Sequence, residues 1–215
     1  ADTTPGPKGS PILPQLKNKS EKYYMDINLD IESGIVRLKQ KIEYYNNTGS
    51  ELGELKLHLY ANAYRSYELA FDKYDLESAY PDGFSQGKID ILSVSSKSKK
   101  LTYKMSESDC VLTIPLASPL GNGNTAELEI ESIITVPVCR GRFGNYAGLM
   151  SLSGFFPKMC VYGENGWDTT SYHFIGDPFY SNIGDYYVNL TLDEKAVLAT
   201  TGSINKVSEG EKRVY

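Results

Sequence analysis

Strict alternation of apolar and polar residues is the feature that most limits how this chain can fold. In residues 23–32 every second side chain is apolar, and after Gly34 the pattern largely resumes over residues 35–45. A period of two places the apolar side chains on one face of an extended strand, whereas a helix needs a period near 3.6. The turn-forming sequence Asn-Asn-Thr-Gly follows at 46–49. We therefore expect two antiparallel, half-buried strands at the start of the fold.

Shorter segments with strand character continue along the chain, separated by turn signals such as Gly-Asn-Gly-Asn at 121–124. We expect these strands at residues 54–60, 88–94, 101–105, 110–116, 125–136, 186–192 and 197–201. Between residues 61 and 80 the aromatic residues have the spacing of one face of a short helix. They are Tyr64, Tyr67, Phe71 and Tyr74. The sequence thus predicts a mainly β fold, an antiparallel saddle-like β-sandwich with one short helix.

The two ends of the chain differ from this pattern. Residues 1–20 are rich in proline and glycine with little to bury, which predicts a flexible tether. Such a tether often follows a removed signal or a membrane anchor, so an extracellular or membrane-anchored protein is favoured slightly over a cytoplasmic one. Residues 21–215 form the expected β-domain. Because residues 212–215 resemble the start of another strand, we expect the domain to be truncated at or near its C-terminal boundary.

The overall charge argues against some partners. The formal net charge is −5, and nucleic-acid binding needs clustered lysines and arginines that outnumber the acids. No window approaches the roughly 20 apolar residues that a membrane span needs. We therefore expect no nucleic-acid partner and no membrane span in this chain.

Three cysteines occur, Cys110, Cys139 and Cys160, and their spacing matches no metal-binding pattern. An odd number allows one disulfide at most, and the sequence leaves open whether Cys139 pairs with Cys160. The simplest expectation is that all three are buried free thiols, which behave as small apolar residues.

No catalytic motif is found in the sequence. A zinc site of the HExxH type needs two histidines four residues apart, but the only histidines are His58 and His173, and neither precedes a glutamate. We expect His58 on the polar face of a strand and His173 in a loop. A loose metal site combining Cys139 and Cys160 with His173 and Asp177 matches no standard zinc spacing. We therefore assign no catalytic residue and no metal ligand in this chain.

The stretch from Gly154 to Val188 has an unusual composition, because it holds the only tryptophan together with many tyrosines and phenylalanines. Its aromatic rim, held by nearby prolines and glycines, suits a domain interface better than a substrate-cleft wall. The rim residues are Phe155, Phe156, Trp167, Phe179 and Tyr180. Glu164-Asn165-Gly166 reads as a hairpin turn that projects Trp167. We expect Phe155, Phe156 and Trp167 to be partly exposed in the isolated chain.

Several segments, taken in order, resemble one known family. They are Tyr-Met-Asp-Ile-Asn-Leu-Asp at 24–30 with Tyr-Tyr-Asn-Asn-Thr at 44–48, Leu-His-Leu-Tyr-Ala-Asn-Ala at 57–63, Gly-Arg-Phe-Gly at 141–144, and the aromatic stretch through Gly202. With these segments the chain resembles the N-terminal β-domain of the aminopeptidase N-type (gluzincin) zinc metallopeptidases, a family that includes leukotriene hydrolase, and it is most similar to the bacterial branch. The resemblance covers residues 23–215.

The resemblance implies a non-catalytic role. In that family the N-terminal domain packs on a following catalytic domain, which holds the zinc ion and binds the peptide substrate. The expected partners are thus a C-terminal catalytic domain of the same polypeptide and a peptide, and the expected cofactor is zinc in that other domain. The family also places a Gln or Glu ahead of the proline matching Pro157, where this chain has Gly148. Asn145 or Tyr146 is then the candidate contact to the substrate.

Two other functions stay open. The first is a self-sufficient β-sandwich that binds a glycan or a protein partner through exposed tyrosine and tryptophan side chains. The second is an independent hydrolase, which the missing motifs disfavour.

Overall fold

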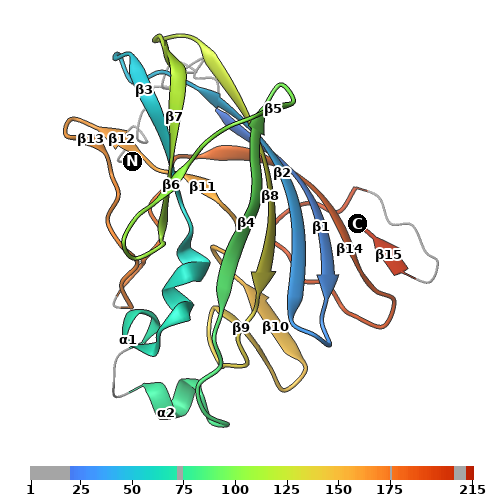
Figure 1. The fold of residues 1–215 in the computed structure, drawn as a ribbon. Coiled ribbons are helices and arrows are strands. Elements are labelled where there is room, and N and C mark those ends of the chain that lie inside the picture. Colours follow the sequence, from blue (N-terminus) through green and yellow to red (C-terminus); the bar gives the residue numbers. More distant parts are fainter. Residues whose placement is uncertain (1–19, 72–74, 175, 206–211) are drawn as a thin grey trace, which may run out of the picture.

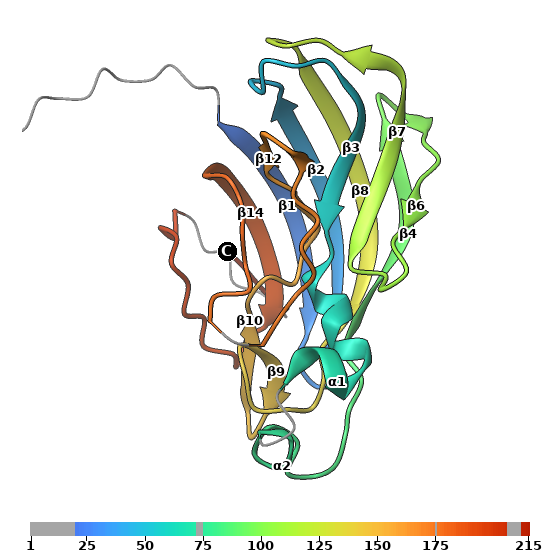
Figure 2. The ribbon, with the colours of Figure 1, turned by 90° about the vertical axis from the view of Figure 1, so that its left-hand side faces the viewer.

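Two β-sheets packed face to face make up most of the structure (Figure 1; Figure 2). The computed structural model describes residues 20–71, 75–174, 176–205 and 212–215. The larger sheet has seven strands in the order β15-β14-β1-β2-β8-β4-β5, and the smaller has four in the order β11-β3-β7-β6. The predicted mainly β sandwich is therefore confirmed.

The larger sheet is built around the strands with strict alternation. Its members are β1 (Glu21–Asp30), β2 (Ile35–Tyr45), β4 (Lys88–Ser96), β5 (Lys99–Lys100), β8 (Thr125–Thr135), β14 (Gly184–Asp193) and β15 (Lys212–Val214). All neighbouring strands run antiparallel except β1 and β14, which are parallel. This pair is an exception to the predicted antiparallel arrangement, which holds for the other neighbouring strands of the sheet. The reason is that β14 follows a long connection, so its direction is not fixed by a hairpin.

The smaller sheet and two hairpins complete the β structure. The sheet consists of β3 (Leu52–His58), β6 (Lys104–Met105), β7 (Val111–Leu120) and β11 (Lys158–Met159). The hairpins are β9 (Phe143–Tyr146) with β10 (Leu149–Leu152), and β12 (Tyr162–Gly163) with β13 (Gly166–Trp167). The second hairpin has its turn at the predicted place, just ahead of Trp167.

The core lies between the two sheets. The alternating apolar residues of β2 and β8, such as Leu38 and Ile130, face Leu57 and Ile114 of the smaller sheet, and all four are fully buried. Figure 2 shows the two layers nearly edge-on, with the short helices and the β9–β10 hairpin at one end. Burial of this aliphatic layer is the main source of stability for such a sandwich.

The predicted single helix is instead three short turns of helix: η1 (Tyr60–Arg65), α1 (Tyr67–Ala70) and α2 (Leu76–Ala79). Ser66 has an extended backbone, which ends η1, and its side chain accepts a hydrogen bond from the Glu68 N–H at the start of α1. Tyr64 points into the core, but Tyr67 is exposed, so the aromatic residues do not share one face. Tyr74 lies outside the described residues.

Some expected elements differ at the ends. Residues 197–201 form no strand, because no strand among the described residues pairs with them. The strand expected at 101–105 is reduced to β6, whereas the strand expected from residue 212 is confirmed as β15. The tether predicted at residues 1–20 lies almost entirely outside the described residues. Within the described part of the chain, no helix is long and apolar enough to cross a membrane.

Candidate functional site

The β9–β10 hairpin carries the three predicted substrate contacts, Asn145, Tyr146 and Gly148. The two residues between its strands, Ala147 and Gly148, both have positive φ, 51° and 82°. This combination is typical of a tight two-residue hairpin turn, in which glycine is favoured. Gly148 is therefore explained by the turn, and it offers neither an amide nor a carboxylate side chain.

Asn145 forms hydrogen bonds that hold the hairpin in place. Its Nδ2 donates a hydrogen bond to the Ile31 carbonyl at 2.9 Å, and its backbone N–H donates to the Pro137 carbonyl at 2.8 Å. The first bond ties the hairpin to the turn between β1 and β2, and the second ties it to the segment after β8. The side-chain oxygen of Asn145 and the second hydrogen of its Nδ2 are left for a possible ligand.

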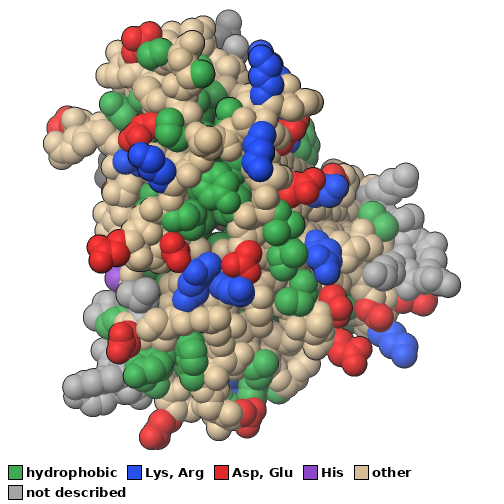
Figure 3. Space-filling model, viewed as in Figure 1, with side chains coloured by type: hydrophobic (Ala, Val, Ile, Leu, Met, Phe, Trp, Pro, Cys, Tyr) green, Lys and Arg blue, Asp and Glu red, His purple; other side chains and the backbone are tan. Residues whose placement is uncertain are grey.

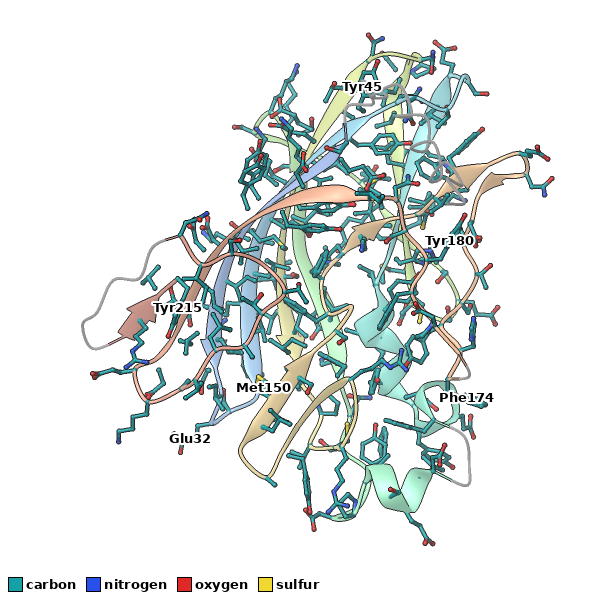
Figure 4. All side chains as sticks on the ribbon, turned by 180° about the vertical axis from the view of Figure 1, so that it is seen from behind. Glu32, Tyr45, Met150, Phe174, Tyr180 and Tyr215 are labelled. Atoms are coloured by element: carbon teal, nitrogen blue, oxygen red, sulfur yellow. The ribbon has the colours of Figure 1, made fainter. Side chains whose placement is uncertain are left out.

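Tyr146 is the more available candidate. Its half-buried ring lies under the guanidinium of Arg140, which is 4.7 Å from the ring centroid. Such a cation–π contact orients an aromatic ring at an exposed site without burying it in the core. In Figure 4 the label on Met150 of β10 marks the β9–β10 hairpin.

The five predicted rim residues do not behave alike. Phe155 is buried, with 8% of its surface exposed, so its expected partial exposure is wrong. Its ring packs edge-on against Phe156 at 5.4 Å. Phe156 and Trp167 are partly exposed, as predicted, and Phe179 is also partly exposed. Tyr180 is 57% exposed and is labelled in Figure 4.

Tyr60 anchors the end of this aromatic stretch. Its hydroxyl accepts a hydrogen bond from the Tyr180 N–H at 3.3 Å, and its ring meets Phe179 edge-on at 5.2 Å. Gly154 has a φ of 62°, and a Cβ there would collide with the Phe179 ring. Tyr60 of η1 thus holds the part of the rim formed by Phe179 and Tyr180.

A buried polar cluster lies behind the rim. The Tyr23 hydroxyl donates to the Glu21 carboxylate and accepts from the Met159 N–H at 3.2 Å, while Asn182 Nδ2 donates to the other Glu21 oxygen at 3.0 Å. Burial raises the pKa of Glu21 from its usual value, although both hydrogen bonds oppose the rise. This cluster joins β1 to β11 and to the loop before β14.

Lys158 completes the cluster. Its Nζ lies 5.9 Å from the Phe156 ring centroid and 5.6 Å from that of Tyr186. Burial lowers the pKa of Lys158, and the negative charge of Glu21 opposes this shift. Sequence reasoning missed the cluster. The alternation of side chains along the strand could have revealed it, because Glu21 lies two residues before Tyr23 and therefore on the same inward face of β1.

The expected position of His58 on the polar face of a strand is wrong. His58 is only 2% exposed, not on a polar surface, because the chain after β13 covers that face of β3. Its ring stacks on Tyr60 at 4.6 Å. Burial lowers the pKa of His58, while the nearby Asp168 opposes the change. His173 lies in a loop and is exposed, as expected.

The residues that the structure describes do not form a zinc site. Among the described residues, no three His, Cys, Asp or Glu side chains gather as metal ligands, so Cys139 and Cys160 do not form one with His173 and Asp177. All three cysteines are buried and free, as expected, and Cys139 and Cys160 do not pair. Burial raises the pKa of Cys139 to about 11 and that of Cys160 to about 12, so both are unreactive thiols.

A groove adjoins the β12–β13 hairpin. It has a volume of about 320 Å³ and is lined by Glu51, Glu54, Lys56, Tyr162 and Trp167, among others. Figure 3 shows that the face of the molecule seen in Figure 1 mixes apolar and charged side chains. The arrangement around the aromatic rim can bind or pack.

Comparison with known proteins finds structural relatives only. No protein-family model matches the chain, and no curated protein sequence matches it. The M1 zinc metallopeptidase from Deinococcus radiodurans is similar in structure, with a TM-score of 0.57 and 14% identity over 91% of this chain and 37% of that chain. A mutant of that enzyme bound to a Tyr-Ser-Ala substrate matches with a TM-score of 0.53, 13% identity and the same shares.

A two-domain M1 zinc metallopeptidase mutant bound to L-arginine matches with a TM-score of 0.51 and 11% identity, over 91% of this chain and 37% of that one. The chain thus spans little more than a third of the solved chains that it matches. At these identities the likeness concerns the fold. The chain has the β-rich fold found in one part of the M1 zinc metallopeptidases.

Proposed function

We propose that this chain is the non-catalytic N-terminal domain of a zinc metallopeptidase of the M1 type, with aminopeptidase activity in the complete protein. It packs on a separate catalytic domain and helps to line that domain's substrate cleft. The observation that carries the proposal is the fold match over 91% of this chain and 37% of the metallopeptidase chain. The absence of a metal-ligand cluster among the described residues fits a division of labour in which another domain binds zinc.

The aromatic rim supports the packing role. Phe156, Trp167, Phe179 and Tyr180 present a partly exposed surface, and the hydrogen bonds of Tyr60 to the Tyr180 backbone fix part of it. Aromatic side chains are enriched where two protein surfaces meet, because they bury a large area with little loss of conformational freedom. We assign this rim to the contact with the catalytic domain.

The substrate role is assigned to Tyr146, with Asn145 as its support. The Asn145 Nδ2 donates to the Ile31 carbonyl and so holds the hairpin in place. Under this proposal Tyr146 is the side chain that meets the substrate. Gly148 supplies the tight turn between the strands. A peptide substrate would then meet Tyr146, two residues before Gly148, the position at which the family that this chain resembles has a Gln or Glu.

The test uses the complete protein, as encoded by the full gene. One equivalent of bound zinc and release of N-terminal residues from peptides are expected, both lost on removal of zinc by a chelator. The separate chain of residues 1–215 serves as control and should do neither. A complete protein without a zinc-dependent peptidase activity would contradict the proposal.

The alternative is a self-sufficient binding module. The groove beside Trp167, with Glu51 and Glu54 along it, is the observation that favours a sugar, because sugars stack on aromatic rings and bond to carboxylates. A glycan array probed with residues 1–215 and with the Trp167→Ala variant tests it. Binding that Trp167→Ala abolishes would favour the module, and no binding would count against it.

A further inference from the structure

The larger sheet has a hollow on its outer face. The hollow has a volume of about 560 Å³ and lies over β14, β1, β2, β8 and β4, which are neighbours in that order (Figure 1). Polar side chains of β1, β2 and β14 line it together with Leu92 of β4 and Ile133 of β8. Thr191 of β14 pairs with Asn28 of β1 on one side and with Val214 of β15 on the other. At Thr191 the hollow therefore lies within the paired part of the sheet.

One row of side chains in the hollow offers free hydrogen-bonding groups. Thr191 on β14, Asn28 on β1 and Arg37 on β2 are direct cross-strand neighbours, and Ile133 on β8 lies opposite Arg37. Arg37 and Ile133 each lie between two buried residues, so this row is on the outward face. Among the described residues, the side chains of Thr191, Asn28 and Arg37 form no hydrogen bond or ion pair with another residue. Their polar groups are thus available to a ligand.

The neighbouring row is already satisfied in part. Asn189 Nδ2 donates a hydrogen bond to Asp26 Oδ1 at 2.7 Å, and Lys39 forms an ion pair with Glu131 at 3.4 Å. Both carboxylates that line the hollow thus have partners other than Arg37, whose positive charge is left without a partner. Asp26 Oδ2 has no partner within the described chain and remains a free acceptor.

This combination of groups matches a sugar that carries a carboxylate. A guanidinium pairs with a carboxylate through two parallel hydrogen bonds, and Arg37 is free to do so. The Asn28 amide, the Thr191 hydroxyl and Asp26 Oδ2 together offer donors and acceptors, which suit sugar hydroxyl groups because a hydroxyl can act as either. Leu92 is 55% exposed and supplies an apolar surface for the C–H groups of a sugar ring. A simple inorganic anion would use the guanidinium alone, and a neutral sugar would leave it unpaired.

We propose that this hollow binds an acidic sugar of the uronic acid type, with its carboxylate on Arg37 and its hydroxyl groups on Asn28, Thr191 and Asp26. The register supports this assignment. Arg37 lies directly across from Asn28, and Asp26 lies two residues from Asn28 along β1, a distance of about 7 Å. One sugar ring with its substituents spans such a distance.

The inference goes beyond the proposed function and does not rest on it. The aromatic rim lies toward the inner side of the larger sheet, because Phe156 meets the inward ring of Tyr23 edge-on at 6.1 Å. Asp26 and Asn28 point from the same strand to the outer side. Contact of the rim with another domain and binding of a sugar in the hollow are therefore compatible, and either can fail without the other.

An NMR titration of residues 1–215 with trigalacturonic acid tests the proposal. We expect saturable shifts of the backbone amide signals of Asn28, Arg37 and Thr191. Arg37→Ala should weaken binding on the order of 10-fold or more, because it removes a charge-assisted pair. The matched control is Arg142→Ala, which removes the same charge from an exposed arginine beside the Phe179 ring and should leave the affinity unchanged.

A second variant and two further ligands sharpen the test. Asn28→Ala should weaken binding several-fold, since it removes hydrogen bonds to neutral hydroxyl groups. Galactotriose, which lacks the carboxylates, should bind on the order of 10-fold more weakly than trigalacturonic acid. Sodium sulfate at matched ionic strength should not displace the sugar. An unshifted Leu38 amide signal in each variant shows that the fold is intact.

Four results would overturn the proposal. The first is no saturable binding of trigalacturonic acid or of a glucuronic acid oligosaccharide. The second is an equal loss of affinity in Arg37→Ala and Arg142→Ala, which would indicate unspecific attraction of charge. The third is displacement by sulfate, which would indicate a site for inorganic anions. The fourth is a set of shifts around Trp167 in place of Arg37, which would assign the sugar to the other groove.

Discussion

β2 and β14 carry the same alternation of apolar residues and lie in one sheet, with only β1 between them, yet they are buried very differently. In β2 the inward residues are all buried. In β14 only Leu192 is fully buried, while Tyr186 and Val188 are exposed. Alternation therefore states which face of a strand is apolar, but the neighbouring layer decides whether that face is buried. β14 lacks such a layer in the described chain.

The largest expected effect tests this contrast through stability. Leu38→Ala in β2 should lower the free energy of unfolding of residues 1–215 by about 3 kcal/mol, because it removes buried methyl groups and leaves a cavity. Val188→Ala in β14 should change it by less than about 0.5 kcal/mol, because Val188 is already exposed. Urea unfolding monitored by circular dichroism measures both. Equal losses of unfolding free energy in the two variants would contradict the difference in burial between β2 and β14.

The buried polar cluster gives a smaller effect. Tyr23→Phe removes the hydroxyl that serves Glu21 and the Met159 N–H, so it should cost about 1–3 kcal/mol. Tyr24→Phe, on the neighbouring outward position, is the matched control and should cost close to nothing. The same urea experiment applies. A neutral Tyr23→Phe would mean that water replaces the hydroxyl.

His58 predicts a dependence of stability on pH. Burial lowers its folded-state pKa below the ordinary value of 6.5, so the unfolded chain takes up the proton first as the pH falls. The contribution of His58 to the free energy of unfolding should be constant above pH 6.5. It should fall below that pH by at most about 1.4 kcal/mol per pH unit. The His58→Gln variant should lack this part of the slope. Identical slopes in the two proteins would show that His58 is not buried as described.

The smallest expected effect concerns the β9–β10 hairpin in the complete protein. Under the proposed function, Tyr146→Ala should raise KM for a peptide several-fold, a change of about 1 kcal/mol, with little effect on kcat. The Arg140→Ala variant, which removes only the cation above the ring, should do less. Steady-state kinetics measure KM and kcat of both variants. An unchanged KM would remove Tyr146 from the substrate site.

Much of the fold follows from local sequence, but the exceptions have a common cause. The alternating segments of β1, β2 and β8 and the turn before Trp167 are local signals, and the structure bears them out. The parallel pairing of β14 with β1, the burial of His58 and the burial of Phe155 depend on segments far away in sequence. No local pattern encodes such contacts.

In the candidate site, too, some features follow from local sequence and others depend on distant segments. The turn at Gly148 could be read from the sequence, because glycine suits a positive φ. The role of Asn145 could not, because its partner is the Ile31 carbonyl, more than a hundred residues away. Glu21 was missed since a charged residue at the start of a strand is normally exposed.

Hydroxyl-radical footprinting of the aromatic rim is the most direct test of the central claim, that the rim is a contact surface for a catalytic domain. Phe156, Trp167 and Tyr180 are measured in residues 1–215 and in the complete protein, with exposed Leu92 of β4 as the reference. The account predicts several-fold lower labelling of the three rim residues in the complete protein, with Leu92 unchanged. Equal labelling of the rim in both proteins would contradict it.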